Sequence, residues 1–227
     1  MLSPKKDLPM FRVAGLLCLL IAVLSGCGGP LRAVRSDGID ERLMLSGYDA
    51  VAYFTKGQPE CGRVAIKADY DGMTFRFASE QHRRMFLAAP EKYVPQFGGF
   101  CTSGMIYGLK QSSDPKAWEI YEGKLYIFGD QLGKSHWSGN KAMRTRYAHQ
   151  MWESEAKQTP SRQQTFYRWL NHVPWYVNRW AVQAERERLG IKIDYDTGNW
   201  LANMLWQEPG WRVVRDGYHC SENLGIK

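Results

Sequence analysis

The chain has 227 residues, of which 44% are hydrophobic and 23% charged, and its formal net charge is +7. This length allows one domain with a sizeable core, or one domain with an appended segment. The mean hydropathy of −0.45 is typical of a globular body and excludes a multi-span membrane protein. The positive charge is not gathered into a basic run or a nucleic-acid-binding motif, so we expect no nucleic-acid partner.

The first residues have the pattern of an export signal. Three basic residues precede an apolar run over 13–24, which is too short to span a bilayer comfortably. The run ends in Leu-Ser-Gly-Cys at 24–27, which is similar to a bacterial lipoprotein signal and implies a lipid on Cys27. The alternative is an uncleaved single-pass anchor. Both place the folded part in the cell envelope, facing the periplasm and held at a membrane.

Five cysteines are present, and two of them belong to the N-terminal signal, because Cys18 lies within it and Cys27 would carry the lipid. Cys61, Cys101 and Cys220 remain. In an oxidising compartment, three cysteines allow one intramolecular disulfide and leave one thiol over. The sequence does not choose the pair.

The first elements are predicted around a hairpin. Residues 50–54 alternate in the manner of a short strand. Residues 64–70 and 73–78 flank Asp71-Gly72, which suits a type I′ turn because both central positions need positive φ. Ser79 is the expected N-cap of a helix that runs to about Ala89.

A glycine turn follows this helix. Gly98 and Gly99 give the backbone access to positive φ, and they hold Cys101 on a defined bend. Residues 102–110 suit a short helix and an extended segment equally well. Residues 118–121 and 124–128 predict a second hairpin around a Glu-Gly turn, and 139–156 predict a helix.

The last third of the chain is rich in tryptophan. Seven of the nine tryptophans lie at or after position 152, and three helices are predicted at about 161–170, 174–190 and 196–206. These rings suit either an aromatic core that holds the segment to the first domain, or an amphipathic surface at the lipid interface.

Four motifs occur in the same order as in the YHS-domain proteins. They are Gly-Tyr-Asp-Ala-Val-Ala-Tyr-Phe at 47–54, Tyr-Asp-Gly-Met-Thr-Phe-Arg-Phe-Ala-Ser at 70–79, Pro-Glu-Lys-Tyr at 90–93 and Gly-Gly-Phe-Cys at 98–101. The chain therefore resembles that family over about 45–152. The resemblance implies an α+β fold with a small antiparallel sheet and packed helices. We expect a signal peptide over 1–26, a tether over 27–44, the YHS-like domain over 45–152 and a mostly helical Trp-rich extension over 153–227.

The resemblance also implies a soft metal ion held by cysteines, at positions that correspond here to Ala52, Ala78 and His82. Two of these three residues cannot bind a metal, so the usual site is predicted to be lost. Cys101 together with His82 is the replacement pair that could hold copper or zinc. The third ligand stays open among Cys61, Tyr48, Asp49, His136 and His149.

Further ligand-binding candidates are Tyr48 and Asp49, together with the glycine pair Gly98 and Gly99, which lets a ligand approach the backbone closely. For Asp49, the alternative is a turn residue that bonds the nearby backbone. For Cys101, the alternatives are a core side chain, half of a disulfide or a redox thiol.

The sequence thus favours a non-enzymatic envelope lipoprotein that binds a small ligand, in the first place a transition-metal ion through Cys101. No catalytic motif indicates an enzyme. The competing hypothesis is a metal-free binding or assembly module, whose Trp-rich region docks an envelope protein partner or the membrane surface.

Overall fold

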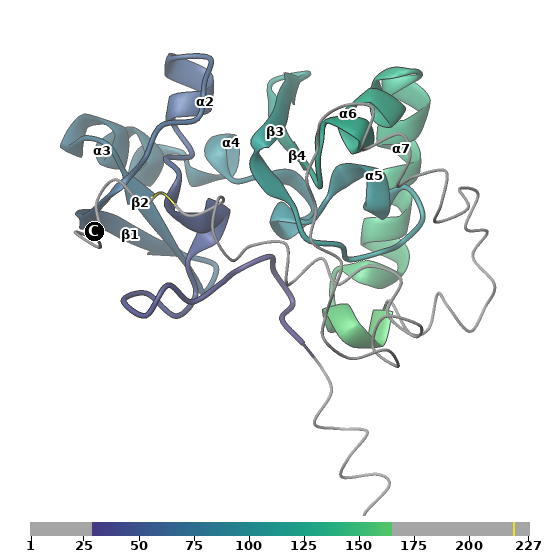
Figure 1. Cartoon of the computed structure of the whole chain (residues 1–227), viewed down its shortest axis with the longest axis horizontal. Helices are drawn as coiled ribbons and strands as arrows, with labels where there is room; N and C mark the ends of the chain where they lie inside the picture. The colour runs from purple at the N-terminus through teal and green to yellow at the C-terminus, as the bar shows by residue number, and fades with distance from the viewer. Residues whose placement is uncertain (1–28, 165–219, 221–227) are drawn as a thin grey trace, which may run out of the picture.

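The structure is a computed structural model that describes residues 29–164 and Cys220. The expected signal peptide with Cys27, and nearly all of the Trp-rich extension, lie outside these residues. The architecture is α+β, as predicted, but it holds two separate two-stranded antiparallel sheets where the sequence predicted one sheet with packed helices (Figure 1). Each sheet belongs to a unit with its own helices.

The first unit is built on the predicted hairpin around Asp71-Gly72. Both turn residues have positive φ, 49° and 67°, as a type I′ turn requires. The elements of this unit are the 3₁₀ turn η1 (Met44–Gly47), α2 (Ala52–Thr55), β1 (Arg63–Tyr70), β2 (Met73–Phe77), α3 (Glu80–Ala88) and α4 (Pro90–Tyr93).

The second unit is built on the second predicted hairpin. Its elements are the 3₁₀ turn η2 (Gln96–Gly99), α5 (Thr102–Met105), β3 (Asp114–Tyr121), β4 (Lys124–Phe128), α6 (Gln131–Ser138), α7 (Lys141–Met151) and the π-helical turn η3 (Trp152–Ala156). The predicted helix over 139–156 is thus confirmed as α7 with its continuation, whereas α6 was not predicted.

The two units repeat one another in order and in backbone detail. Each has a 3₁₀ turn that contains left-handed residues, a one-turn helix, a bulged hairpin and a capped helix. Leu45 and Phe97 occupy the same place in the two 3₁₀ turns, with φ of 52° and 55°. Ser79 and Asp130 cap the helices that follow the hairpins, since each side chain accepts a bond from a backbone N–H of the first turn.

One sequence prediction was wrong in the first unit, because residues 50–54 form no strand and α2 takes their place. The Asp49 carboxylate accepts the backbone N–H of Val51 at 2.8 Å and so starts the helix. This contact is the nearby backbone bond that the alternative for Asp49 predicts, and it does not by itself decide between that role and ligand binding. The helix predicted to run to about Ala89 is α3, which ends at Ala88, and Pro90 then opens α4 at the first helical position.

Strand β4 contributes to two hydrophobic cores. Leu125 and Ile127 pack with the core of the first unit, which includes Phe75 and Phe86. Tyr126 and Phe128 point the other way, into a second core around Trp137. Because side chains alternate along a strand, one strand can serve both cores and hold the two units together.

Residues 33–44 fall in the stretch expected to be a tether, yet the structure packs them on the body. Leu43 is 1% exposed and forms bridges with Arg35 and with Thr74 of β2. The buried guanidinium of Arg76 bonds Asp37 at 2.6 Å and Asp40 at 2.6 and 2.8 Å. Burial on its own would raise the pKa of each carboxyl. Hydrogen bonds from Arg76, and for Asp40 also from Lys67, outweigh this effect and lower both pKa values.

We predict that Arg76→Ala lowers the free energy of unfolding by about 3–5 kcal/mol, because it leaves two buried carboxylates without their cation. Chemical denaturation measures this change. Arg83→Ala is the matched control: Arg83 pairs with Glu80 near the surface, so we expect a loss of at most about 1 kcal/mol. An equal effect of the two variants would contradict the prediction.

The same network sets the response to acid. The folded-state pKa values of Asp37 and Asp40 lie below the ordinary 3.8, so their contribution to stability is present above that pH and lost as the pH falls further. We predict a steep loss of stability below about pH 4 in the parent protein and a smaller loss in Arg76→Ala. Denaturation midpoints measured from pH 3 to 6 test this, and parallel curves would contradict it.

The disulfide joins Cys61 to Cys220 across 159 residues. Cys220 is 5% exposed, packs in the first core and donates its backbone N–H to the Ser46 carbonyl at 3.3 Å.

We predict that removal of this disulfide by the double substitution Cys61→Ser and Cys220→Ser reduces the free energy of unfolding by about 2–5 kcal/mol, since the link restricts a long loop in the unfolded chain. Denaturation of the parent with and without reductant gives the comparison. Equal midpoints under both conditions would show that the link adds no stability.

Candidate functional site

Asp49 is the polar centre of the first unit. Its side chain is fully buried, with 0% exposure, at the junction of α2, β2 and α3. One carboxylate oxygen accepts Val51 N–H and the other accepts Ala78 N–H, each at 2.8 Å. The carboxylate thereby ties the start of α2 to the end of the first hairpin.

His82 completes this centre from the first turn of α3. Its Nδ1 lies 2.6 Å from Asp49 Oδ2, and its Nε2 lies 3.2 Å from the Thr55 hydroxyl at the end of α2. The ring is buried, whereas Thr55 is exposed. A carboxylate on one ring nitrogen fixes the orientation of the imidazole and leaves the other nitrogen directed toward the surface.

Glu60 brings a second carboxylate to the same place. Ligand atoms of Asp49, Glu60 and His82 all lie within 4.8 Å of one another. The Asp49 backbone N–H donates to the Glu60 carbonyl at 2.8 Å, which holds the loop before β1 beside α2. The Glu60 side chain is paired with Lys56 at 2.7 Å.

Two carboxylates and an imidazole are a ligand set that zinc and copper(II) accept. The 2.6 Å separation of Asp49 Oδ2 and His82 Nδ1 is that of a hydrogen bond, shorter than the roughly 3.3 Å between two ligands that share one tetrahedral zinc. An ion bound here would therefore replace the proton between Asp49 and His82 and compete with the Lys56 ammonium for Glu60.

Cys101 lies in the second unit, away from this group. Its side chain is 4% exposed, and the sulfur accepts the Gly129 backbone N–H at 3.1 Å. It is the thiol that stays outside the disulfide. Within the described part of the chain, no group of three converging His, Cys, Asp or Glu residues includes Cys101. The geometry brings His82 to Asp49 and not to Cys101.

The glycine pair before Cys101 is packed against the chain's own N-terminal segment. A Cβ at Gly98 would come within 2.6 Å of Arg32 Cδ, and one at Gly99 within 2.8 Å of Met44 Sδ. The Gly98 carbonyl accepts Ala33 N–H at 2.8 Å. The turn requires glycine because other parts of the protein approach it closely.

The remaining candidates contact other parts of the protein. Tyr48 is 6% exposed and packs in the first core, where its backbone bridges to Cys61. His136 lies 3.3 Å from the Tyr107 hydroxyl, and His149 lies 3.2 Å from the Tyr126 hydroxyl. Burial lowers the pKa of both histidines, so they are mainly neutral at pH 7.

The repeat shows what the fold itself needs at the position of Asp49. Cys101 takes the same place in the second unit: its sulfur accepts an amide from the end of the hairpin, and its own N–H donates to the Gln111 carbonyl at 3.0 Å. Gly133 takes the place of His82, since both donate their N–H to the residue that caps the helix. One acceptor is thus enough to bind the amide at the end of the hairpin in each unit. Of the two units, the first has two carboxylates and an imidazole at this place, and the second has none of these groups.

Glu60 and Thr55 were missed in the sequence. The signal that points to Glu60 is the repeat itself, in which Ser-Gly-Tyr-Asp at 46–49 corresponds to Gly-Gly-Phe-Cys at 98–101. Aligning the two copies places Glu60 opposite Gln111 and His82 opposite Gly133. The acidic and imidazole groups of the first copy then stand out as differences.

Comparison with protein-family models, curated proteins and solved structures finds no match to this chain. The resemblance to YHS-domain proteins therefore stays a prediction from the sequence. Over residues 29–164, no helix is both long and apolar enough to cross a membrane.

We predict that the Cys101 thiol of the folded, mature protein resists alkylation, because reagents react with exposed thiolates and this sulfur is buried. Labelling with iodoacetamide, followed by mass spectrometry, should modify Cys101 in denaturant and leave it unmodified in buffer. Rapid labelling of the native protein would contradict the burial and would favour the redox role considered from the sequence.

Proposed function

We propose that this protein is a lipid-anchored protein of the cell envelope, and that its first unit binds one divalent transition-metal ion, zinc or copper(II). The ligands are Asp49, Glu60 and His82. The observation that carries the proposal is the convergence of ligand atoms of these three side chains within 4.8 Å in the first unit. The second unit forms the same fold with a single acceptor, the Cys101 sulfur, at the position of Asp49.

The placement in the envelope has two supports. The sequence carries a lipoprotein-like signal that ends at Cys27, and the fold contains the Cys61–Cys220 disulfide. Structural disulfides form and persist in oxidising compartments such as the bacterial periplasm. A thiol in such a compartment is better protected when it is buried, as Cys101 is.

The resemblance to the YHS-domain proteins favours metal binding but implies cysteine ligands. In this chain the sulfur is the less suitable donor, because no group of three converging ligand residues in the described part of the chain includes Cys101. His82, which matches one of the family's ligand positions, is the residue that both lines of argument share. Oxygen and nitrogen ligands favour zinc or copper(II) over copper(I).

The chemistry of the site makes binding dependent on pH. An ion takes the place of the proton held between His82 and Asp49, so binding releases a proton and weakens as the pH falls. An ion on the Asp49 side of the ring leaves His82 Nε2 bonded to the Thr55 hydroxyl, which keeps the imidazole oriented.

A specific observation favours a second candidate, a metal-free binding or assembly module. The Asp49 carboxylate already accepts two close backbone N–H groups as well as the His82 ring, so the centre is satisfied as a structural link between α2, β2 and α3. In that case the Trp-rich region docks an envelope protein or the membrane.

Titration of the metal-stripped mature protein with Zn(II) and Cu(II) by calorimetry tests the proposal. We expect one ion per chain, and an affinity at least about tenfold lower in Glu60→Gln and in His82→Ala, because each variant removes one ligand. Glu60→Gln is nearly isosteric and leaves the buried hydrogen bonds of Asp49 intact, so it separates loss of a ligand from loss of folding.

Cys101→Ser and His149→Gln are the controls, and both should bind like the parent. Unchanged affinity in Glu60→Gln and His82→Ala would overturn the proposed ligand set. Loss of binding in Cys101→Ser alone would restore the sulfur as the ligand. Absence of binding in the parent protein would favour the metal-free module.

A further inference from the structure

The described chain is held in place from its first residues. The Pro30 carbonyl accepts Ser161 N–H at 3.2 Å, and the Leu31 carbonyl accepts the Lys110 ammonium at 3.1 Å. Two residues later, Ala33 donates its N–H to Gly98. There is consequently no free linker between Pro30 and the body of the protein.

Two cations fix this segment to both units. Arg32 pairs with Asp71 of the first hairpin at 2.9 Å and lies 5.7 Å from the ring centre of Trp152. Lys110 lies 5.2 Å from the same ring and donates to the Thr159 carbonyl at 2.7 Å. Each cation over an aromatic face adds attraction on the order of 1 kcal/mol, so movement of this segment would disrupt contacts in both units.

The distance to Cys27 is set by covalent geometry. Gly29 is two steps along the chain from Cys27, and an extended chain covers at most about 3.6 Å per step, which gives roughly 7 Å. The polar headgroup layer of one leaflet is itself about 5–7 Å deep. A lipid on Cys27 would therefore bring Gly29 to the level of the headgroups.

We infer that the edge formed by Gly29, Pro30, Leu31 and Arg162 lies directly on the phospholipid headgroups, with one fixed orientation of the protein. This inference rests on the proposed lipid anchor. It does not depend on the proposed metal site.

The side chains of this edge suit that surface. Leu31 is 40% exposed, so its side chain is available to enter the headgroup layer. Arg162 is exposed and lies beside Gly29, where an added Cβ would meet the Arg162 side chain at 3.2 Å. A guanidinium binds phosphate through paired hydrogen bonds, so a bilayer that contains anionic phospholipid is the matching partner.

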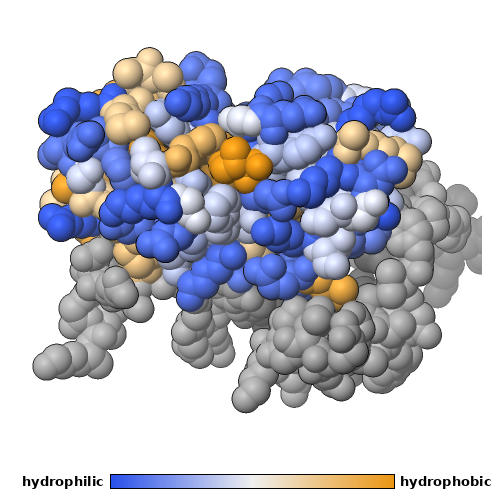
Figure 2. All heavy atoms as spheres, turned by 90° about the horizontal axis from the view of Figure 1, so that it is seen from above, coloured by the Kyte–Doolittle hydropathy of each residue, from blue (hydrophilic) through white to orange (hydrophobic). Residues whose placement is uncertain are grey.

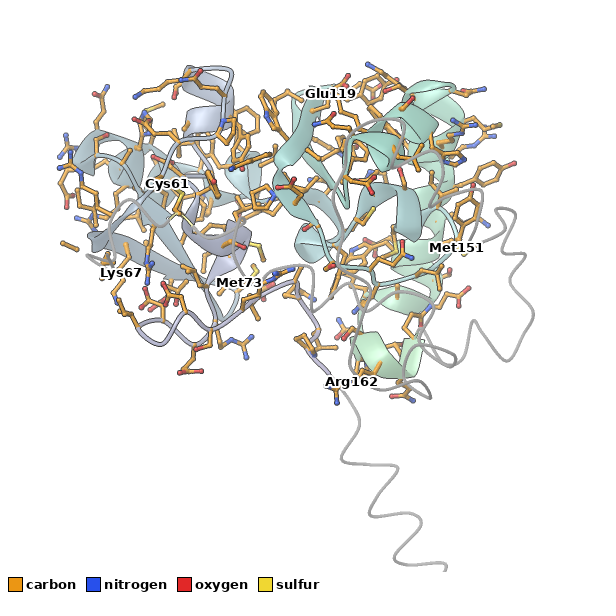
Figure 3. The ribbon with its side chains drawn as sticks, in the orientation of Figure 1. Cys61, Lys67, Met73, Glu119, Met151 and Arg162 are labelled. Carbon is orange, nitrogen blue, oxygen red and sulfur yellow. A yellow bond between two sulfur atoms is a disulfide. The ribbon has the colours of Figure 1, made fainter. Side chains whose placement is uncertain are left out.

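The opposite edge faces away from the membrane in this orientation. The segment that begins at residue 29 starts at the lower side of Figure 1, and Arg162 lies at the lower edge of Figure 3, whereas α2 stands at the upper edge of the molecule. The upper face is mostly hydrophilic, with a small hydrophobic patch near its middle (Figure 2). Thr55 at the end of α2, beside the candidate metal site, would be directed to the aqueous periplasm.

Contact with lipid can be tested with the lipidated full-length protein in phosphatidylglycerol-containing vesicles. A benzophenone-bearing amino acid replaces Leu31 in one variant and Leu87 in another. Leu87 is the matched control, because it is a leucine of similar exposure, 52%, at the end of α3. Irradiation followed by mass spectrometry measures lipid adducts, and mass analysis of the N-terminus establishes lipidation of Cys27.

We expect about tenfold more lipid adduct at position 31 than at position 87, because insertion requires contact and the headgroup layer is only about 5–7 Å deep. A Gly-Ser spacer of about ten residues between Gly28 and Gly29, with a span of roughly 17 Å, should remove most of this difference. Arg162→Glu in the position 31 variant should lower its adduct yield.

The failures are distinguishable. If Cys27 carries no lipid, the proposed anchor fails and this inference fails with it. If Cys27 is lipidated and positions 31 and 87 label equally, the anchor stands and the fixed orientation is overturned. The same conclusion follows if the spacer leaves the difference unchanged.

Discussion

A single acceptor at the start of each unit organises the protein. After a left-handed 3₁₀ turn, Asp49 or Cys101 accepts an amide from the end of its own hairpin, and its backbone N–H bonds the loop before that hairpin. The turn, the short helix and the hairpin are thereby fixed relative to one another. Because buried amides must be satisfied, neither position can lose its acceptor without cost. In the first unit the acceptor is a carboxylate, which also binds the His82 ring through its second contact on Oδ2.

The two units depend on shared parts. Strand β4 supplies side chains to both cores, and the segment that precedes η1 covers the glycine turn of the second unit while it pairs with the first hairpin. Neither unit completes its hydrophobic core and surface packing without residues of the other unit or of the shared segment. The fold is better regarded as one body with two related halves, and a site in the first half is supported by packing from the second.

The features that local patterns could predict are those with local causes. Both hairpins follow from turn residues that tolerate positive φ, and α3 follows from its Ser79 cap. The one-turn helix α2 could not be predicted, because its start depends on the Asp49 side chain and not on periodicity. The partner of His82 was also inaccessible to spacing arguments, since Asp49 lies in another element. Cys101 was favoured as a ligand because the glycine pair resembles the approach to a binding site, whereas in the structure that pair serves close packing.

The Cys61–Cys220 bond has a further consequence for the integrity of the molecule. Every peptide bond between these two residues lies inside a covalent ring. A protease that cuts once anywhere in that ring opens it without releasing a fragment, and the two pieces part only when the disulfide is reduced. The chain beyond the second unit can therefore be nicked in an oxidising environment while it stays joined to the first unit.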